Sequence, residues 1–253
     1  METKRCLTDY FDVQCAQKIA SQIVFVHSSF PKEQFVAHIS SQLKEKMLLA
    51  RQDVFAQALE VFLPFSYEKN LLLLNKILGH PLPTESGMFT YGYWLWPIGR
   101  YVERNALLAP DETVQFVHAL TQRFTGEFAL RPLITHQPEY LLRALSSWVI
   151  DESVHVRRCA SECVRIRLPW AKKQRSVLQH QHLYFSLLLS LKHDSSRFVQ
   201  KSVANNINDL YKEDTSLAQK LVASFNKDAS KHTQWIIRHG SRWYRKQQAA
   251  GGL

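Results

Sequence analysis

The chain has 253 residues, 45% of them apolar, which is enough to bury a sizeable core. It contains only eight glycines and nine prolines, a composition that disfavours turn-rich β architecture and favours long helices. Lysine and arginine total 32 against 22 aspartates and glutamates, and the formal net charge of +10 points to a polyanionic partner, either nucleic acid or a membrane surface.

Signals for other compartments are absent from the sequence. No apolar run approaches the roughly 20 residues that a transmembrane helix needs, and the beginning, METKRCLTDYFDVQ, has no apolar signal core. None of the four cysteines forms a CxxC pair, and Cys159 and Cys163 stand one helical turn apart. We therefore expect a cytoplasmic protein with reduced cysteines and no membrane association.

The first half of the chain is predicted to be helical. Apolar residues recur at helical spacing in 14–26, 33–48 and 52–62, and the run LLLLNKIL at 71–78 continues the pattern. The segment HPLPTESGMFTYG (80–92) carries two prolines and two glycines, which predicts a loop. The aromatic residues of YWLWPIGRYVERNAL, which follows, are expected to pack at the end of a helix.

The second half is predicted to be helical as well, with no strand. Its expected helices are 112–123, 138–149, 154–167, 182–191, 197–211, 215–225 and 233–247.

The second half also contains an internal repeat. DESVHVRRCASECV (151–164) aligns with DSSRFVQKSVANNI (194–207), and a fainter copy is seen at 235–243. A two-helix unit that recurs every ~40–47 residues is typical of HEAT repeats. We therefore predict an all-α fold of HEAT-like repeats in a curved α-solenoid, with the aspartates of the aligned segments in N-cap regions. The predicted organisation is a single domain, 1–248, divided into a helical amino-terminal part (1–110) and the repeats (111–248), followed by a flexible tail at 249–253.

The repeat predicts how polar residues are arranged. Arg158, Glu162 and Arg165 have +4 and +3 spacing and would form one stripe on a helix. The repeat-mate would place Lys201, Asn205 and Asn208 on the matching stripe, with Asp209 beside it. Since neighbouring repeat helices lie ~10 Å apart, both stripes would face one basic groove that contains acids. The small or apolar residues Val156, Cys159, Ala160, Cys163, Ser202 and Ala204 would face the core or a neighbouring helix.

Long sequence blocks carry a resemblance to a known family. They are TQRFTGEFALRP (121–132), VRRCASECVRIRLPW (156–170), LLLSLKHDSSRFVQKSVANNINDLYK (187–212) and WIIRHG (235–240). The chain from Thr121 to about Lys246 closely resembles the AlkC branch of the AlkC/AlkD-like DNA alkylation repair glycosylases. Weaker similarity extends through WPIGRYVERNAL to the amino terminus.

The resemblance implies a monofunctional DNA glycosylase of base excision repair that removes cationic bases such as 3-methyladenine and 3-methylcytosine. It implies catalytic roles for Glu127, Glu162, Asp209 and Trp170, and it places family arginines on Arg158 and Arg165. It also implies a monomer that acts on alkylated double-stranded DNA, in bacteria at the nucleoid.

Two positions depart from the family pattern. Cys163 replaces a glycine, which could crowd a close approach, and Ile166 replaces a proline, which would let the helix run longer.

The chemistry explains why a basic segment should contain an acid. A base methylated at a ring nitrogen is already a good leaving group, so the reaction mainly needs carboxylates that stabilise the developing positive charge on the sugar and place a water. Arg158 and Arg165 would keep Glu162 ionised and grip phosphates. An exposed Trp170 could contribute ~0.5–2 kcal/mol by cation–π contact.

Each of these residues also has an ordinary structural explanation. Glu162 could be a salt-bridged helix residue, Asp209 a surface charge and Trp170 a core residue, while Glu127 could simply pair with Arg131.

The remaining basic residues are candidate grips on the DNA backbone. We predict DNA contacts by Arg157, Lys172, Lys173, Lys201, Arg238 and Arg242 besides Arg158 and Arg165. The sequence has neither GxGxxG nor GxxxxGK[ST], and it has no HExxH or paired cysteines, so it indicates no cofactor and no catalytic metal.

Two other classes of function remain open at this point. A non-catalytic HEAT-repeat protein could bind branched or damaged DNA, and a HEAT scaffold could present its basic surface to an acidic protein. Release of free base distinguishes the enzyme from both, and salt-sensitive DNA affinity distinguishes the DNA binder from the scaffold.

Overall fold

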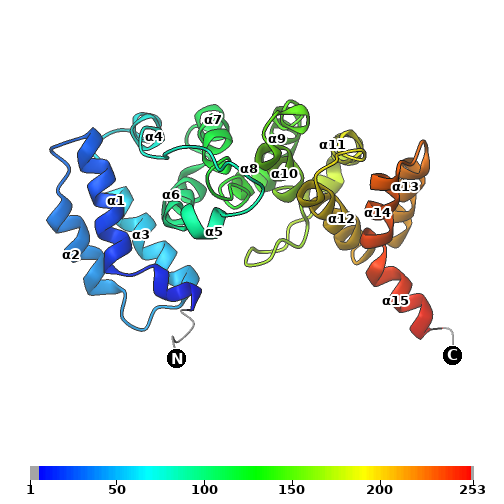
Figure 1. Cartoon of the computed structure of the whole chain (residues 1–253), viewed down its shortest axis with the longest axis horizontal. Helices are drawn as coiled ribbons and strands as arrows, with labels where there is room; N and C mark the ends of the chain where they lie inside the picture. The colour runs from blue at the N-terminus through cyan, green and yellow to red at the C-terminus, as the bar shows by residue number, and fades with distance from the viewer. Residues whose placement is uncertain (1–5, 252–253) are drawn as a thin grey trace. The chain divides into compact units, whose positions relative to one another are not determined.

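The structure is a computed structural model that describes residues 6–251. These residues form helices and turns and contain no strand, which confirms the predicted all-α class. The chain divides into two compact units, Met1–Pro132 and Leu133–Leu253 (Figure 1). The predicted single domain remains a prediction.

The first unit contains the helices α1 to α7. Their bounds are α1 Val13–Val26, α2 Lys32–Gln42, α3 Leu48–Phe62, α4 Tyr67–Asn75, α5 Met88–Tyr91, α6 Trp96–Asn105 and α7 Pro110–Thr121. Helix α1 packs on α2, α3 packs on α6, and α4 packs on α7. The short helix α8, Arg131–His136, begins at the end of this unit.

Aromatic rings fill part of the first unit's core. Trp96, the first residue of α6, is buried, and its ring centroid lies 5.7 Å from that of Phe11 and 5.8 Å from that of Phe124. The ring of Phe128 stacks on it at 6.1 Å. The expectation that aromatic residues pack at a helix end is therefore confirmed at Trp96.

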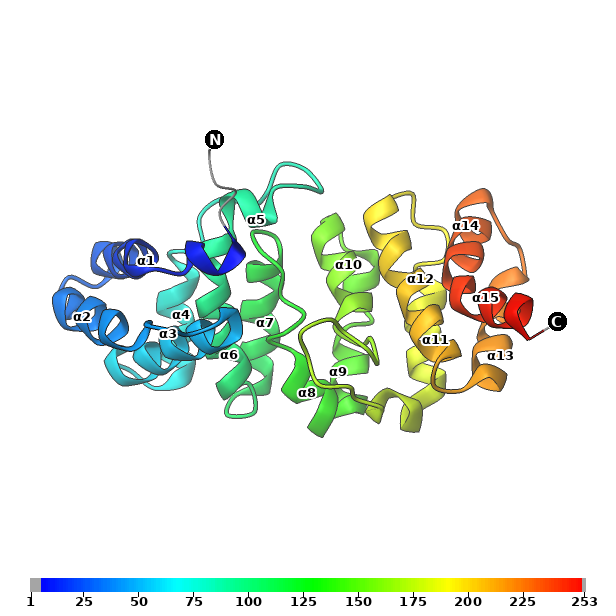
Figure 2. The same ribbon diagram turned by 90° about the horizontal axis from the view of Figure 1, so that it is seen from below.

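The second unit arranges helices in two rows. Its bounds are α9 Pro138–Ala144, α10 Val154–Glu162, α11 Gln181–Ser190, α12 Arg197–Tyr211, α13 Thr215–Asn226, α14 Lys231–Gly240 and α15 Arg242–Ala250, with 3₁₀ turns at Trp148–Ile150 and Ser176–His180. Helices α10, α12 and α14 lie side by side in that order, and α9, α11 and α13 form the second row (Figure 2). This is the stacking of two-helix repeats that the aligned sequence segments predict.

The repeat has a shared start signal. Ser153 and Ser196 are the N-cap residues of α10 and α12. Two residues earlier, Asp151 Oδ1 accepts from the Ser153 N–H at 2.7 Å and Asp194 Oδ1 accepts from the Ser196 N–H at 2.8 Å. The aspartates therefore hold the capping serine in place rather than occupying the N-cap position itself.

A third D-x-S sequence precedes α14. There Ser230 is the N-cap, and its hydroxyl accepts from the Thr233 N–H at 3.3 Å. Asp228 follows Asp194 at an offset of 34 residues, so the D-x-S signal marks the start of three repeat helices, α10, α12 and α14.

Several predicted helices differ in their ends. The helix expected over 33–48 ends at Gln42, and Glu45 has a left-handed φ of 60°, which breaks the helix. The helix expected over 138–149 ends at Ala144 and is followed by the 3₁₀ turn. The one expected over 233–247 divides at Ser241 into α14 and α15.

Two further differences concern the loop at 80–92 and the chain end. The loop contains the short helix α5 after Gly87, and α8 had no sequence prediction. In the predicted tail, Ala249 and Ala250 are the last residues of α15, and 252–253 lie outside the described residues.

Candidate active site

The site is built at the carboxyl end of α10. That helix ends at Glu162, so the predicted helix over 154–167 is too long and Arg165 follows the helix instead of belonging to it. Ile166 is fully buried in the turn, so the residue does not lengthen the helix as expected. Cys163 is buried with a right-handed φ of −68°, a backbone conformation that requires no glycine.

Glu162 is held at both carboxylate oxygens. Its Oε1 accepts from Arg165 Nη1 at 2.8 Å and lies 3.4 Å from Arg158 Nη2. Its Oε2 accepts from the Ser202 hydroxyl at 2.7 Å. Burial by itself would raise the pKa of Glu162, but the charges of Arg158 and Arg165 and these hydrogen bonds outweigh it, so the pKa lies below its ordinary value. The carboxylate is therefore fixed and ionised.

Asp209 is the second carboxylate of the site, and it comes from the neighbouring repeat helix α12. Arg165 donates to Asp209 through Nε at 3.0 Å, and the Arg167 backbone N–H donates to the same oxygen at 3.3 Å. Burial raises the pKa of Asp209 above its ordinary value, and Arg165 offsets this only in part. One guanidinium thus joins the two acids, as the paired repeat stripes predict.

Two buried serine hydroxyls form a hydrogen-bond chain that ends at Glu162. Ser161 donates to the Ser202 hydroxyl at 2.7 Å, and Ser202 donates onward to Glu162. Asn206 donates to the Ser161 carbonyl at 2.7 Å and so ties α12 to α10. The sequence predicts Ser202 only as a small helix-contact residue. Its position seven residues before Asp209, on the same face of α12, is the signal that could have identified it as a partner of Glu162.

The predicted stripe on α12 is only partly observed. Lys201 is exposed, and Asn205 accepts from Arg242 Nη2 at 2.9 Å. Asn208 is buried, and its Oδ1 accepts no hydrogen bond, so its place on a groove-facing stripe stays a prediction. The expected core positions Val156, Ala160 and Cys163 are all fully buried, as predicted.

Trp170 lies in the turn after Pro169 and is 56% exposed, which excludes the core explanation. Its φ of 62° lies in the left-handed region, which bulky residues rarely adopt. Backbone strain of this kind, about 1–3 kcal/mol, persists where surrounding structure enforces it and is common at functional sites.

Glu127 belongs to the first unit. It lies in the turn between α7 and α8 and is 4% exposed, and Arg131 at the start of α8 is also buried. The site in the second unit is thus formed by Glu162, Asp209 and their arginines, and Glu127 is a residue of the first unit.

The predicted DNA-binding residues fall into two groups. In the first group, Arg158 and Arg165 pair with Glu162, Arg157 pairs with Asp194 at 2.7 Å, and Lys173 pairs with Glu213 at 3.4 Å. Lys172, Lys201 and Arg238 are exposed, and Arg242 is half-buried, with its Nη1 donating to the His239 carbonyl at 2.7 Å.

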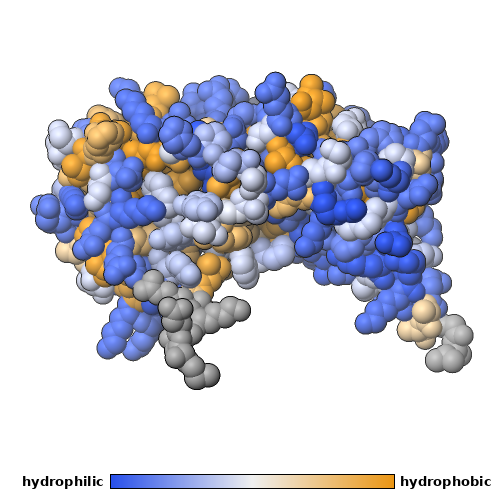
Figure 3. All heavy atoms as spheres, in the orientation of Figure 1, coloured by the Kyte–Doolittle hydropathy of each residue, from blue (hydrophilic) through white to orange (hydrophobic). Residues whose placement is uncertain are grey.

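Lys201, Arg238 and Arg242 lie on α12, α14 and α15, respectively. Burial and the charges of Arg242, Lys201 and Arg197 lower the pKa of His239, which favours its neutral form. Arg197 lies over the Trp235 ring at 4.0 Å. In Figure 3 the visible face over α14 and α15 is mostly hydrophilic. This end of the second unit is therefore the part that best suits a polyanion.

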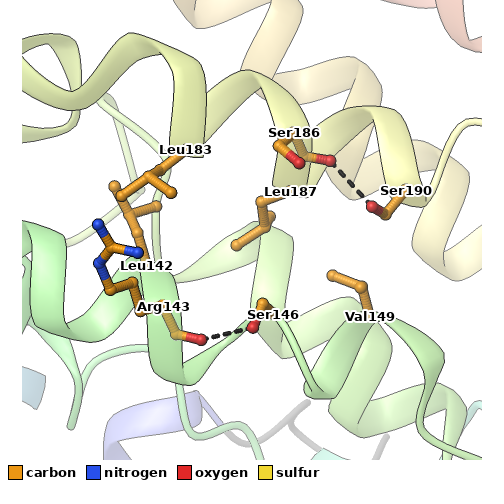
Figure 4. Close-up of a pocket in the computed structure, with 8 residues that line it drawn as sticks. All are labelled: Leu142, Arg143, Ser146, Val149, Leu183, Ser186, Leu187 and Ser190. Carbon is orange, nitrogen blue, oxygen red and sulfur yellow. Dashed lines mark hydrogen bonds between the residues drawn. The ribbon is translucent and has the colours of Figure 1, made fainter.

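A pocket between α9 and α11 is separate from the carboxylates. It has a volume of about 230 Å³, and its lining combines apolar residues (Leu142, Val149, Leu183 and Leu187) with Arg143 and three serines (Figure 4). Ser146 donates to the Arg143 carbonyl at 2.6 Å and Ser190 to the Ser186 carbonyl at 3.0 Å, so these serines are satisfied locally. None of the predicted catalytic residues lines it.

Two further features concern ligands and membranes. Within residues 6–251, no group of three or more histidine, cysteine or acidic side chains is arranged to hold a metal ion. In the same part of the chain, no helix is both long and apolar enough to cross a membrane. The described cysteines, Cys6, Cys15, Cys159 and Cys163, form no disulfide with one another.

Fold and site together define an all-α repeat protein in which arginines hold carboxylates from successive repeats. The model of the family described as DNA alkylation repair enzyme matches residues 124–244. The chain is 32% identical over 245 residues to the uncharacterized protein YhaZ of Bacillus subtilis, covering 93% of this chain and 64% of that protein. It is also similar to a solved structure, Pseudomonas fluorescens alkylpurine DNA glycosylase AlkC bound to DNA containing an abasic site analog. There the TM-score is 0.82 at 30% identity, over 95% of this chain and 65% of that one.

Residues 124–244 thus match the DNA alkylation repair enzyme family, and the similarity to these two relatives extends over nearly the whole chain. The chain spans slightly less than two thirds of the length of these two relatives.

Proposed function

We propose that this chain is a DNA glycosylase that releases alkylated, cationic bases such as 3-methyladenine and 3-methylcytosine from double-stranded DNA. The observation that carries the proposal is the fixed, ionised carboxylate of Glu162, held by Arg158 and Arg165 and linked through Arg165 to Asp209. The resemblance to a glycosylase bound to an abasic-site analogue supports it, since an abasic site is what base release leaves behind.

The reaction divides into departure of the base and addition of water. The bond between the sugar C1′ and the base nitrogen breaks, and its electron pair leaves with the base and neutralises the ring charge. The sugar becomes oxocarbenium-like, and water then adds to C1′ and loses a proton. A fixed carboxylate stabilises the developing positive charge without reorganising, which lowers the barrier. Glu162 is the group that we assign to this role.

The other predicted residues have supporting roles in this proposal. Asp209 is the carboxylate best suited to accept the proton of the attacking water, because burial makes its anion the more basic of the two. Trp170 offers an exposed indole face to the sugar or the cationic base. Glu127 remains a candidate for a further catalytic acid, because it occupies an acidic position of the family motif. Substitution of Glu127 tests whether it contributes to base release.

Phosphate contacts are assigned first to the exposed cations. Lys201 and Arg238 are exposed, so they can reach phosphates without breaking an internal ion pair, and Lys172 is exposed as well. Arg157 and Lys173 would have to leave Asp194 and Glu213, which makes them weaker candidates than the sequence suggests.

The test is release of methylated bases from duplex DNA under single-turnover conditions. Glu162→Gln removes the charge while keeping the shape, and we expect release to slow by at least about 10²-fold, the usual cost of losing one electrostatic stabiliser of a transition state. The matched control is Glu139→Gln, which neutralises an exposed acid on α9 that pairs with Arg143. Equal release by wild type and Glu162→Gln would remove Glu162 from the mechanism.

The ion pairing of the acids also favours a second candidate, a repeat protein that binds damaged DNA without cleaving it. The side chains of Glu162 and Asp209 are only 7% and 4% exposed, as structural ion pairs often are. In that case the protein releases no base but keeps a DNA affinity that falls steeply with salt.

A further inference from the structure

One acid outside the loop that carries Trp170 binds three of the loop's cations. Glu213 lies in the turn between α12 and α13, and its side chain is 1% exposed. Its Oε1 accepts from Arg167 Nε at 2.7 Å and lies 3.4 Å from Lys173 Nζ. Its Oε2 accepts from Arg175 Nε at 2.5 Å. Three cations on both sides of Trp170 thus converge on one carboxylate.

The cations themselves remain at the surface. The side chains of Arg167, Lys173 and Arg175 are 41%, 42% and 61% exposed, so together they cover Glu213 without being buried. Burial would raise the pKa of Glu213, but hydrogen bonds from Arg175 and Arg167 and the nearby charges outweigh it, so the pKa lies below its ordinary value. Glu213 is ionised and acts as the shared counter-ion of the loop.

The inner end of the same loop is fixed to the carboxylate site. Arg165 Nη2 donates to the Arg167 carbonyl at 3.2 Å, and the Arg167 N–H donates to Asp209. The loop closes on itself where the Gln174 N–H donates to the Ile166 carbonyl at 3.1 Å. Trp170 stands between these anchors with its left-handed backbone. A loop fixed at its ends and by a hydrogen bond between its two sides can hold a residue in a backbone conformation that an isolated turn would not keep.

We propose that Glu213 is a positioning residue: by binding Arg167, Lys173 and Arg175 at once, it holds the 167–175 loop so that Trp170 is presented beside the carboxylate pair. The part of this inference that concerns catalysis rests on the proposed glycosylase function, and the part that concerns the loop does not. Glu213 also neutralises one of the three positive charges, which weakens the attraction of this loop for DNA phosphates. In exchange, the loop has a fixed geometry.

The direction in which DNA affinity changes distinguishes this role from a merely structural one. Neutralising Glu213 leaves three uncompensated cations close together, so the loop should open while its charge becomes more attractive to DNA. We therefore expect Glu213→Gln to raise non-specific duplex affinity at low salt about threefold, in line with one additional phosphate contact. Simple loss of folded protein would lower the affinity instead.

The first experiment measures the loop directly by limited trypsin digestion, since Arg167, Lys172, Lys173 and Arg175 are cleavage sites. Glu213→Gln should be cut between 167 and 175 at least about tenfold faster than wild type, because the open form is populated once the ion pairs are lost. Glu213→Asp retains the charge and should restore part of the protection, and the control Glu139→Gln should be cut like wild type. Wild-type protection in Glu213→Gln overturns the proposal, whether or not the protein releases base.

The second experiment asks whether Glu213 acts through Trp170. Single-turnover base release is compared for wild type, Glu213→Gln, Trp170→Ala and the double variant. We expect Glu213→Gln to slow release about tenfold in the presence of Trp170 and to have no further effect in Trp170→Ala, the signature of coupled residues. If the double variant loses the product of the two single effects, Glu213 acts independently and the proposal is wrong.

Two outcomes need separate treatment. If wild type releases no base, the proposed function fails, and digestion and affinity still decide whether Glu213 holds the loop. If Glu213→Gln does not fold, the cation side is changed instead: Arg167→Gln with Arg175→Gln should expose Lys172 and Lys173 to trypsin, and continued protection of these sites overturns the proposal.

Discussion

Arg165 Nε lies 3.0 Å from Asp209 Oδ2, although the two residues are 44 positions apart in the chain. The same guanidinium donates to Glu162 at 2.8 Å. Arg165 therefore joins the end of one repeat helix to the next and compensates two nearly buried acids at once. A network of this kind is costly to break, because removing the cation leaves both acids desolvated and unpaired.

Replacing Arg165 should consequently destabilise the protein more than replacing any exposed arginine. We expect Arg165→Met to lower the free energy of unfolding by about 3–5 kcal/mol, the usual cost of removing one partner from a buried ion pair. Urea denaturation at neutral pH measures it.

The matched control is Arg143→Met, which breaks the half-exposed pair with Glu139 on α9. Its cost should stay within about 1 kcal/mol, because solvent screens such pairs. Equal effects of the two substitutions would mean that the buried network contributes nothing special to stability.

The two acids should respond to pH with opposite signs. The folded-state pKa of Asp209 is raised above 3.8, so between 3.8 and the raised pKa the folded protein binds the proton better, and this contribution to stability declines as pH rises. The folded-state pKa of Glu162 lies below 4.5, so its contribution is present above pH 4.5 and is lost as pH falls through the folded pKa.

The measurement is the free energy of unfolding as a function of pH for three proteins. The stability of wild type relative to Asp209→Asn should fall as pH rises above 3.8, and its stability relative to Glu162→Gln should rise as pH climbs toward 4.5. If both stability differences changed with pH in the same direction, the pKa values of Asp209 and Glu162 could not be shifted in opposite directions.

Much of the fold could be predicted because its signals are local. The two aligned segments lie 43 residues apart and correspond to two repeat helices. Both helices have an N-cap serine, Ser153 and Ser196, and a buried valine, Val156 and Val199. Helical periodicity and the repeat together were sufficient to bring Glu162 and Asp209 to neighbouring helices.

The remainder depends on contacts between distant residues. The sequence between Glu162 and Trp170 has no glycine that would mark the end of α10, and the helix stops where Arg165 turns to reach Asp209. The partnership of Glu213 with the 167–175 loop spans 38–46 positions and has no motif of its own. A charge pattern also cannot distinguish an arginine that grips DNA from one, such as Arg157, that holds an aspartate.

Arg157 and Lys201 test that distinction. Arg157 donates to Asp194 and to the Asp151 and Glu152 carbonyls, whereas Lys201 is exposed on α12. We expect Arg157→Met to lower the free energy of unfolding by about 1.5–3 kcal/mol, as for hydrogen bonds to charged groups, and to leave the salt dependence of DNA binding unchanged.

Lys201→Met should do the reverse. It should keep stability and reduce the slope of log affinity against log salt by about 0.9, the value for one lost phosphate contact. Titrations at several salt concentrations measure the slope, and a reduced slope for Arg157→Met would return that residue to the DNA-binding set.

Gly240 provides a packing test of the repeat stack. It lies at the end of α14 where this helix meets α12, and a Cβ built there would come within 2.8 Å of Ile207 Cβ and 3.1 Å of the Ala204 carbonyl oxygen. Because the first atom is next to the backbone and the second belongs to it, neither can move aside without shifting α12. Gly240→Ala should therefore cost about 1–3 kcal/mol, as overpacking of a core does.

The control for this substitution is Gly99 in α6, where a Cβ would meet only Leu120 Cδ2 at an ordinary 3.6 Å. At such a site alanine restricts the unfolded chain, so Gly99→Ala should be neutral or stabilise the protein by up to about 1 kcal/mol. Thermal and urea unfolding of both variants give the comparison. If Gly240→Ala were as stable as Gly99→Ala, α12 and α14 could not be packed as closely at Ile207 as the structure shows.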